Sequence, residues 1–258
     1  MAVHYGGKGP GHIARSIGGF NPRSLFAGGV KGVVFDLSDL STVFSDTAGT
    51  TPAVIDGTIA RINDKSGNGA NATQATGINQ PLLKATGSRY RVLFDGSNDI
   101  LQTAAIDMSA GDEITIVLGL NKTSDAATQV VMENTTGVGS FRVYIPAAGT
   151  GYVHGMTGTA STDTTATGFA APATSVVTGL GKIGTDTNII RVNGVQRTTN
   201  VADLGTGNMG NFALSLGSRV GSFPFSGSIF ALIIINRLLT AAEITLAENW
   251  VNSRTGAY

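Results

Sequence analysis

Short runs of alternating apolar and polar residues are the feature of this sequence that most constrains its fold. Successive side chains of a strand point to opposite faces, so a period of two is typical of antiparallel strands with one buried face. From Gly32 onward such runs are bounded by Gly, Asn, Asp and Thr, and the clearest are Arg91 to Gln102, Glu113 to Leu120, Ser140 to Ile145 and Asn188 to Thr198. The pattern predicts an all-β chain.

Two further segments indicate a hairpin and an edge. Asn193-Gly194 lies between Val192 and Val195 and supplies the two positive φ angles of a type I′ turn, so it predicts a β-hairpin. The segment from Ser161 to Ser175 is rich in Thr and Ala without apolar periodicity, and we interpret it as a decorated loop or a weak edge strand. Because strand patterning resumes after it, a single domain is the simpler interpretation.

The end of the sequence predicts a buried strand and a helix that covers it. Ile229 to Ile235 is almost continuously apolar, which requires cover on both faces. Thr240 and Glu243 have the spacing of a capping box, and Leu239 and Ile244 that of its hydrophobic staple. Gly256 ends the helix. The apolar face of this helix is predicted to contain Ile244, Leu246, Ala247, Trp250 and Val251, so Trp250 is expected in the core rather than as a platform for a sugar.

Residues 1 to 30 differ from the rest and are predicted to be a Gly-rich basic arm, whereas residues 31 to 258 form the folded domain. The arm contains no acidic residue, and its few apolar residues cannot form a core of their own. We expect it to be flexible until it docks on a partner through the cations Lys8, Arg15, Arg23 and Lys31.

Charge and composition argue against several classes of protein. Lys and Arg together number 17, as do Asp and Glu, so no net charge draws the chain to nucleic acid. The absence of Cys excludes disulfides and thiolate metal sites. No run approaches the roughly 18 to 20 apolar residues of a membrane span, and the first residues lack the apolar region of a secretory signal. We therefore expect no membrane insertion.

Five runs between residues 30 and 254 carry a family resemblance. They are Phe35 to Phe44 with Asp46 to Pro52, Asp64 to Gly69 with Asn71 and Gln74, Phe94 to Asp99, Arg191 to Val195, and Phe225 to Ile229 with Asn236 to Glu243. In this order they resemble the concanavalin A-like, laminin-G-like domain of many proteins of tailed bacteriophages and prophages. One departure is Val34-Phe35, which stands where an aromatic pair of the Trp-Tyr type is expected.

The resemblance implies a two-sheet antiparallel jelly-roll sandwich with a flexible N-terminal arm and one C-terminal helix. It also implies a lectin-like architecture and a host-surface glycan as a candidate ligand. Sugar binding does not follow from the fold by itself, because one fold hosts many functions. The missing aromatic pair also reduces the surface on which a sugar could stack.

The first candidate site is a loop that resembles the start of a calcium loop. Asp64, Ser66 and Asn68 occupy its first, third and fifth positions, and Gly69 occupies the sixth. The twelfth position is Ala75 instead of the bidentate Glu that calcium requires. We therefore favour a structural turn and expect no resident cofactor or metal, with calcium as the weaker alternative.

A second candidate set consists of Asp95, Asn98 and Asp99, which could bind a sugar hydroxyl or a cation at the rim of the sandwich. The same residues suit a tight turn, which is the favoured interpretation. Aromatic residues that could stack on a sugar from the surface are Tyr90, Tyr144 and Tyr152.

Signals for catalysis are weak, and no enzymatic activity is predicted. Glycoside hydrolysis needs two carboxylates about 5 to 9 Å apart across a groove. None of the four glutamates, Glu113, Glu133, Glu243 and Glu248, lies in the Glu-x-Asp-x-x-Glu run of glucanases of the same broad fold. His4, His12 and His154 are scattered, and Gly7 to Gly11 resembles a phosphate loop in composition only.

These observations favour a non-enzymatic structural protein of a tailed-phage virion, as capsid decoration or associated with the tail or its fibres. The arm would dock on other virion proteins, and the sandwich would face solvent as an adhesin. A free carbohydrate-binding module and a glycan hydrolase-like protein of the same fold are the alternatives. We expect assembly in the cytoplasm of a bacterial host and a homo-oligomeric state.

Overall fold

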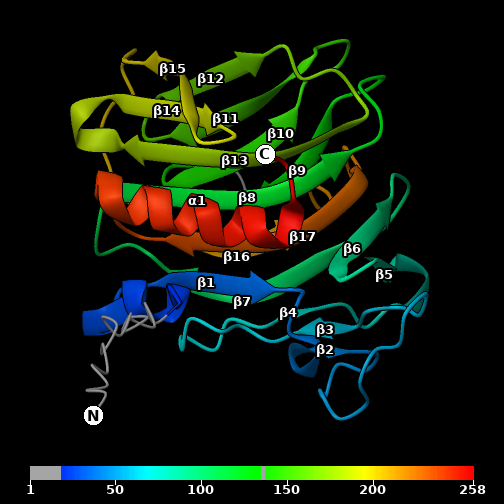
Figure 1. The fold of residues 1–258 in the computed structure, drawn as a ribbon. Helices are drawn as coiled ribbons and strands as arrows, with labels where there is room; N and C mark the ends of the chain where they lie inside the picture. Colours follow the sequence, from blue (N-terminus) through cyan, green and yellow to red (C-terminus); the bar gives the residue numbers. More distant parts are fainter. Residues whose placement is uncertain (1–18, 135–136) are drawn as a thin grey trace, which may run out of the picture.

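Two antiparallel β-sheets packed face to face form the protein in the computed structural model, which describes residues 19–134 and 137–258 (Figure 1). Lys8 and Arg15 of the predicted arm, like His4, His12 and the run from Gly7 to Gly11, lie outside the described residues. The prediction of an all-β, two-sheet antiparallel jelly-roll sandwich with one C-terminal helix is confirmed.

Within the described residues, sheet A has eight strands in the order β15-β14-β13-β8-β17-β6-β5, and β1 also pairs with β17. Its strands are β1 (Gly32–Asp36), β5 (Leu82–Thr86), β6 (Arg89–Asp95), β8 (Glu113–Lys122), β13 (Ala173–Lys182), β14 (Thr187–Val192), β15 (Val195–Asn200) and β17 (Ser226–Ile235).

Sheet B has nine strands in the order β12-β11-β10-β9-β16-β7-β4-β3-β2. They are β2 (Val43–Phe44), β3 (Arg61–Ile62), β4 (Ala72–Thr73), β7 (Leu101–Asp107), β9 (Gln129–Glu133), β10 (Ser140–Ile145), β11 (Gly151–Thr157), β12 (Ser161–Thr167) and β16 (Asn211–Leu216). The helices are α1 (Ala241–Thr255) and the short 3₁₀ turns η1 (Pro22–Gly29), η2 (Leu40–Thr42), η3 (Gly77–Asn79) and η4 (Ile183–Thr185).

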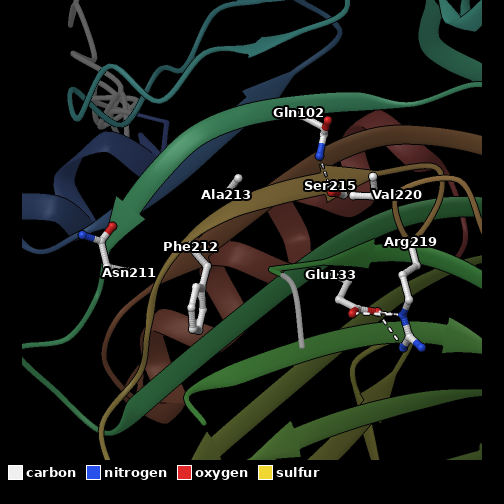
Figure 2. A pocket seen from close by; sticks show the side chains of 8 residues that line it. All are labelled: Gln102, Glu133, Asn211, Phe212, Ala213, Ser215, Arg219 and Val220. Atoms are coloured by element: carbon white, nitrogen blue, oxygen red, sulfur yellow. Dashed lines mark hydrogen bonds and ion pairs between the residues drawn. The ribbon is translucent and has the colours of Figure 1, made fainter. Parts of the chain in front are cut away.

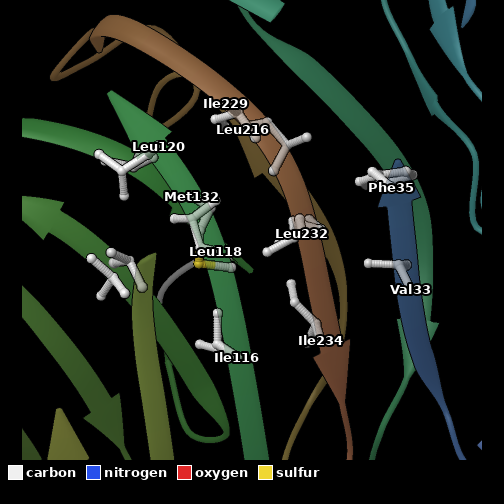
Figure 3. Close-up of a cluster of buried hydrophobic side chains, with 14 of the residues drawn as sticks. Val33, Phe35, Ile116, Leu118, Leu120, Met132, Leu216, Ile229, Leu232 and Ile234 are labelled. Carbon is white, nitrogen blue, oxygen red and sulfur yellow. The ribbon is translucent and has the colours of Figure 1, made fainter. Parts of the chain in front are cut away.

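The main core lies between the two sheets and is filled by the inward side chains of both. In Figure 3, Ile116, Leu118 and Leu120 of β8 alternate along one strand, and Met132 of β9 lies among them. The alternation that predicted the strands therefore marks the buried face. One predicted run, Arg91 to Gln102, spans the end of β6, a turn and the start of β7. Ser161 to Thr167 forms edge strand β12, one of the two interpretations given to that segment.

The outer face of sheet A carries a second apolar cluster, which α1 covers. Val117, Val176, Ile233 and Ile235 point outward from the sheet and pack with Trp250 and other residues of the helix. The capping box is present, since the Glu243 amide donates to Thr240 Oγ1 (3.3 Å) and the Thr240 amide to Glu243 Oε2 (2.9 Å). The helix ends at Gly256, whose φ is 67°.

One residue of the predicted apolar helix face is placed differently. Leu246 is 47% exposed, whereas Ala247, Trp250 and Val251 are buried. The buried face of α1 is thus narrower than the helical spacing alone predicts. The helix lies along β8, β13 and β17 and contacts them with a single stripe of side chains.

The boundary of the predicted arm also needs correction. Leu25 and Phe26 of η1 are buried in the same outer cluster as α1. Arg237 donates from Nη2 to the Leu25 carbonyl (3.3 Å), and Asn68 donates from Nδ2 to the Val30 carbonyl (3.2 Å). The stretch from Pro22 to Val30 therefore packs on the sandwich, because Leu25 and Phe26 are buried against the outward apolar side chains of sheet A.

The predicted hairpin is confirmed, with φ of 53° at Asn193 and 76° at Gly194 between β14 and β15. None of the helices in the described part of the chain combines the length and the apolar character needed to cross a membrane.

Trp250→Ala is expected to cost about 3–5 kcal/mol of unfolding free energy, because a large ring is removed from the outer cluster. Thr240→Ala is expected to cost about 1 kcal/mol through loss of the helix cap. Leu246→Ala, on the exposed side of the same helix, is the control and should stay within about 0.5 kcal/mol of the parent. Chemical denaturation of the three variants makes the measurement, and an unchanged stability of Trp250→Ala would contradict the assignment of α1 as a lid.

Candidate ligand-binding surface on sheet B

The outer face of sheet B carries a row of polar side chains that crosses the strands. Residues directly opposite each other on paired strands project to the same face. The strand registers align, from one edge inward, Asp163, Gly155, Arg142, Glu133, Ser215, Gln102, Thr73 and Arg61. Their chain neighbours, such as Phe141, Met132 and Ile62, belong to the main core. We call these residues the polar row.

Members of the polar row are hydrogen-bonded to one another or to nearby residues. Arg142 donates from Nη2 to Asp163 Oδ1 (2.8 Å), and Gln102 donates from Nε2 to Ser215 Oγ (3.1 Å). Gly155 lies between Arg142 and Asp163, and a Cβ at this position would be 2.6 Å from Arg142 Nε and 2.5 Å from Asp163 Oδ1. The glycine thus provides the space in which the two charged side chains meet.

Tyr144 extends this network along β10. Its hydroxyl donates to Asp163 Oδ2 (2.9 Å), and the Arg142 guanidinium carbon lies 5.6 Å from the centre of its ring. Burial and then the hydrogen bond to Asp163 raise the pKa of Tyr144 to about 12. The phenol therefore stays protonated at neutral pH and acts as a hydrogen-bond donor beside a partly exposed aromatic ring.

A loop after β16 places a second arginine over the middle of the row. Arg219 donates from Nε to both carboxylate oxygens of Glu133 (3.1 and 2.9 Å), and the Glu133 side chain is only 2% exposed. The loop is held by backbone hydrogen bonds between Arg219 and Ser222 and by the Val130 amide, which donates to the Phe223 carbonyl (2.9 Å). Phe223 is 42% exposed, and its ring centre lies 5.3 Å from the Arg219 guanidinium carbon.

Two cavities meet at Arg219. One, of about 390 Å³, is lined by Gln102, Glu133, Phe212, Ser215 and Arg219, and Figure 2 shows the Glu133 and Arg219 side chains paired on one side of it and Gln102 and Ser215 on another. The second, of about 420 Å³, is lined by Thr128, Val130, Arg142, Tyr144, Arg219 and Phe223. Together they offer aromatic rings next to fixed donors and acceptors, the composition typical of a small-ligand site.

Asn98, Tyr144 and Tyr152 of the predicted ligand set are placed differently from one another. Tyr144 belongs to the surface just described, and Asn98 lines a neighbouring cavity that shares Gln102 and Val220 with the first. Tyr152 was expected at the surface and this is wrong, since its side chain is fully buried. It points into the main core from β11, where its hydroxyl donates to Ser175 Oγ (3.1 Å) and burial raises its pKa to about 12.

The loop of Asp64, Ser66 and Asn68 uses its polar groups within the chain. Asp64 Oδ1 accepts from the Val34 and Ser66 amides (2.9 and 2.8 Å), and Oδ2 accepts from Ser66 Oγ and the Ala70 amide (2.6 and 3.2 Å). Asn68 donates to the Gly32 carbonyl (3.1 Å). This is the arrangement of a structural turn, the interpretation that the sequence favours, and calcium binding at the loop stays the weaker alternative. Within the described part of the chain, no cluster of three or more His, Cys, Asp or Glu side chains is arranged to hold a metal.

Asp95 and Asp99 also serve local structure. The Asp95 amide donates to Asp99 Oδ2 (2.9 Å), and Asp95 Oδ1 accepts from the Ser97 amide (2.8 Å). Asp99 is 6% exposed, and desolvation raises the pKa of its carboxyl group. These contacts fix the turn between β6 and β7, as the favoured interpretation of this segment requires.

All four glutamates form ion pairs with basic residues. Glu113 pairs with Lys182, Glu133 with Arg219, Glu243 with Arg237 and Glu248 with Arg191. Each of these contacts fixes the position of a glutamate side chain. The glutamates therefore have structural roles in this arrangement.

Sequence reasoning missed most of the polar row, including Arg142, Glu133, Ser215 and Gln102, and it also missed Arg219 in the loop over the row. One signal was available, because Arg142 alternates with core residues in the same run as Tyr144 and so shares its outward face. The other residues come from strands and a loop far apart in the sequence. Only the strand registers bring them together.

The sequence matches no protein-family model and none of the curated proteins. The structure, by contrast, resembles solved binding domains of botulinum neurotoxins. One neighbour is a structure of botulinum neurotoxin type C, described under the statement that cell entry of this toxin depends on interaction with two ganglioside molecules. Its TM-score is 0.60 at 12% identity, and the match covers 86% of this chain and 51% of that chain.

Two further neighbours agree with this result. The serotype D/C binding domain gives a TM-score of 0.60 at 11% identity, covering 90% of this chain and 53% of that one. The type G receptor-binding domain gives 0.56 at 13% identity, covering 75% and 49%. The chain thus spans about half the length of the solved chains that it matches. At these identities the likeness establishes the fold alone, a two-sheet antiparallel β-sandwich.

His154 lies behind the polar row in the main core and should make stability depend on pH. It is fully buried, and desolvation lowers its pKa from 6.5 to about 4, against the opposing effects of Asn188 and Asp163. Since the unfolded state binds the proton first, stability should fall as pH decreases from about 6.5 to about 4, by about 3 kcal/mol in total.

Urea denaturation at several pH values in this window tests the expectation. His154→Leu removes the titrating group and should flatten the pH dependence, whatever its effect on absolute stability. Carboxylates with lowered pKa, such as those of Asp36 and Glu243, lose their contribution as the pH falls below about 5, so the slope between about pH 6.5 and about pH 5 is the one assigned to His154. An equal slope in the two proteins would show that His154 is not the group responsible.

Proposed function

We propose that this protein binds a glycan through the outer face of sheet B and has no catalytic activity of its own. The observation that carries the proposal is the cavity beside β10, where the rings of Tyr144 and Phe223 flank the guanidinium groups of Arg142 and Arg219. Sugars present apolar C–H faces and rings of hydroxyls, so they are recognised by aromatic surfaces next to fixed donors and acceptors.

The preorganisation of this surface supports binding. Arg142 is held by Asp163 and Arg219 by Glu133, so neither long side chain has to be ordered when a ligand arrives. Part of the hydrogen-bonding capacity stays open, because a guanidinium group has five donors and these contacts use only some of them. The fold is similar to that of a botulinum neurotoxin type C structure, and cell entry of that toxin depends on ganglioside molecules. This similarity supports a glycan as the class of ligand.

The pairing of every glutamate with a cation supports a binding role over glycan hydrolysis. For Glu113 and Glu243 the hydrogen bonds from Lys182 and Arg237 also lower the pKa of the carboxyl group, which makes these two residues poor general acids at neutral pH. A glycan hydrolase-like protein of the same fold is accordingly the weaker alternative.

Arg142→Gln and Phe223→Ala are expected to weaken glycan binding by at least about tenfold, which corresponds to about 1.4 kcal/mol each. A glycan array identifies the ligand, and calorimetry on the best hit measures the affinities. Val201→Ala, 72% exposed and outside the linings of both cavities, is the control. The purified chain should release no reducing sugar from the same glycan.

Two results would contradict the proposal. The first is a bound glycan whose affinity is equal in the parent and in both variants, because binding would then occur elsewhere. The second is release of reducing sugar that disappears when an acidic residue is replaced, because the protein would then be a hydrolase.

The proposed biological context is a tailed-phage virion, in which the chain is a capsid-decoration or tail-associated structural protein. This part of the proposal is supported by the five runs that resemble the laminin-G-like domain of phage and prophage proteins. The basic arm would dock on other virion proteins and leave sheet B facing solvent. The exposed cations Arg23 and Lys31, at the start of the described residues, are part of that proposed docking segment.

Immunogold electron microscopy of purified particles tests the virion assignment. Antibodies against this chain should label intact particles at one repeated location, either the head or the tail. Particles produced without the gene are the matched control. Labelling confined to the soluble fraction of lysed host cells would instead favour a free carbohydrate-binding module.

A further inference from the structure

A further cavity, on the outer face of sheet A, lies at the C-terminal end of α1. It has a volume of about 340 Å³ and opens on the outer face of sheet A, where the helix no longer covers the strands. Its lining includes Arg89 and Arg91 of β6, Asn121, Thr174, Phe230 and Gly256. The polar row belongs to sheet B, so the two surfaces are separate.

Arg89 and Arg91 form no ion pair with a carboxylate in the described part of the chain. Among the described residues, nine other lysines and arginines form ion pairs with Asp or Glu, and Arg23, Lys31, Arg61 and Arg197 also have none. All 17 acidic residues of the sequence lie in the described part of the chain, and none of their oxygens is within 4.0 Å of a nitrogen of Arg89 or Arg91. No acidic side chain therefore pairs directly with the two guanidinium groups of the cavity.

Strand geometry directs both arginines to the same place. Positions 89 and 91 are two apart on β6 and so project to one face, opposite to the core residue Val92. Arg91 is oriented by a hydrogen bond from Nη1 to Thr86 Oγ1 on the neighbouring strand β5 (2.8 Å). Two guanidinium groups thus converge on one cavity.

Arg89 lies against the end of the helix. A Cβ at Gly256 would be 2.4 Å from its guanidinium carbon, so the glycine permits this close approach. The backbone carbonyls at the end of α1 carry a partial negative charge, which favours a cation there. This accounts for the position of Arg89 and leaves most of its hydrogen-bond donors available, because a guanidinium group has five of them.

Neutral groups complete the cavity. Asn121 donates from Nδ2 to Thr174 Oγ1 (3.0 Å), which leaves the Thr174 hydroxyl proton free to donate to a ligand. Phe230 is 7% exposed and contributes an apolar wall. We propose that this cavity binds an oxyanion, the carboxylate or sulfate group of an acidic ligand, through the two arginines and the Thr174 hydroxyl.

Planar, bidentate hydrogen bonding by arginine suits these oxyanions better than a single ammonium group would. The site does not require the polar row, and a protein that binds no neutral glycan could still bind an anion here. Failure of one proposal therefore leaves the other standing.

The test follows the backbone amide signals of Asn121, Thr174 and Gly256 by NMR as sodium sulfate, sodium glucuronate or glucose is added to the full chain. Sulfate and glucuronate should shift these signals in a saturable way, and glucose should not. Added sodium chloride should weaken both effects, because the contact is electrostatic and partly exposed. Comparison of the two affinities distinguishes an inorganic anion from a sugar acid as the better ligand.

Arg91→Gln and Arg89→Gln should each lower the affinity for the anion by about tenfold or more. Arg197→Gln is the matched control, since Arg197 also forms no ion pair among the described residues but lies on β15 at the other edge of sheet A. Melting temperatures are measured in parallel. The proposal is overturned if the signals do not respond to either anion, or if they respond equally in the parent and in Arg91→Gln. It is also overturned if Arg89→Gln lowers the melting temperature and no anion response is seen, because Arg89 would then only contact the end of the helix.

Discussion

The burial of sheet A on both faces is the constraint on which the rest of the structure depends. Strand β17 is apolar on both sides, so it needs the main core on one face and a cover on the other. Helix α1 and η1 supply that cover, and at its edge the sheet becomes polar again, where the cavity of Arg89 and Arg91 opens. Both α1 and η1 lie over sheet A. The outer face of sheet B carries the polar row instead of a second apolar cluster, and this face is the candidate binding surface.

The polar row follows from register alone. A shift of one residue in any of its strands would exchange outward and inward side chains, placing Phe141 or Met132 at the surface and a charged residue in the core. The same pairing that buries the apolar residues therefore fixes the order Asp163, Arg142, Glu133 across the strands. The strand register that the main core requires therefore also fixes the positions of the outward-facing side chains of the polar row.

Local patterns predicted local structure well. The alternation along Ser140 to Ile145 gives β10 with its bounds, Thr240 and Glu243 form the capping box, and Asn193-Gly194 forms the turn. Tyr152 and Leu246 were placed wrongly because periodicity tells which residues share a face, and only tertiary packing tells which face is buried. The candidate surface was predicted for Tyr144 alone, because its other residues are brought together by pairings between β7, β9, β16 and a loop that no local signal encodes.

The two candidate surfaces, on sheet B and on sheet A, differ in whether their arginines are paired with carboxylates. On sheet B the two arginines that line the candidate cavities, Arg142 and Arg219, are each paired with a carboxylate, so those cavities suit a ligand rich in hydroxyl groups. On sheet A the two arginines have no such partner in a chain whose total charge is zero, so the negative charge that compensates them lies elsewhere in the molecule. Desolvating two cations on ligand binding is costly unless the ligand brings a negative charge of its own. A neutral ligand is thus disfavoured at the sheet A cavity for the same reason that an anion is favoured there.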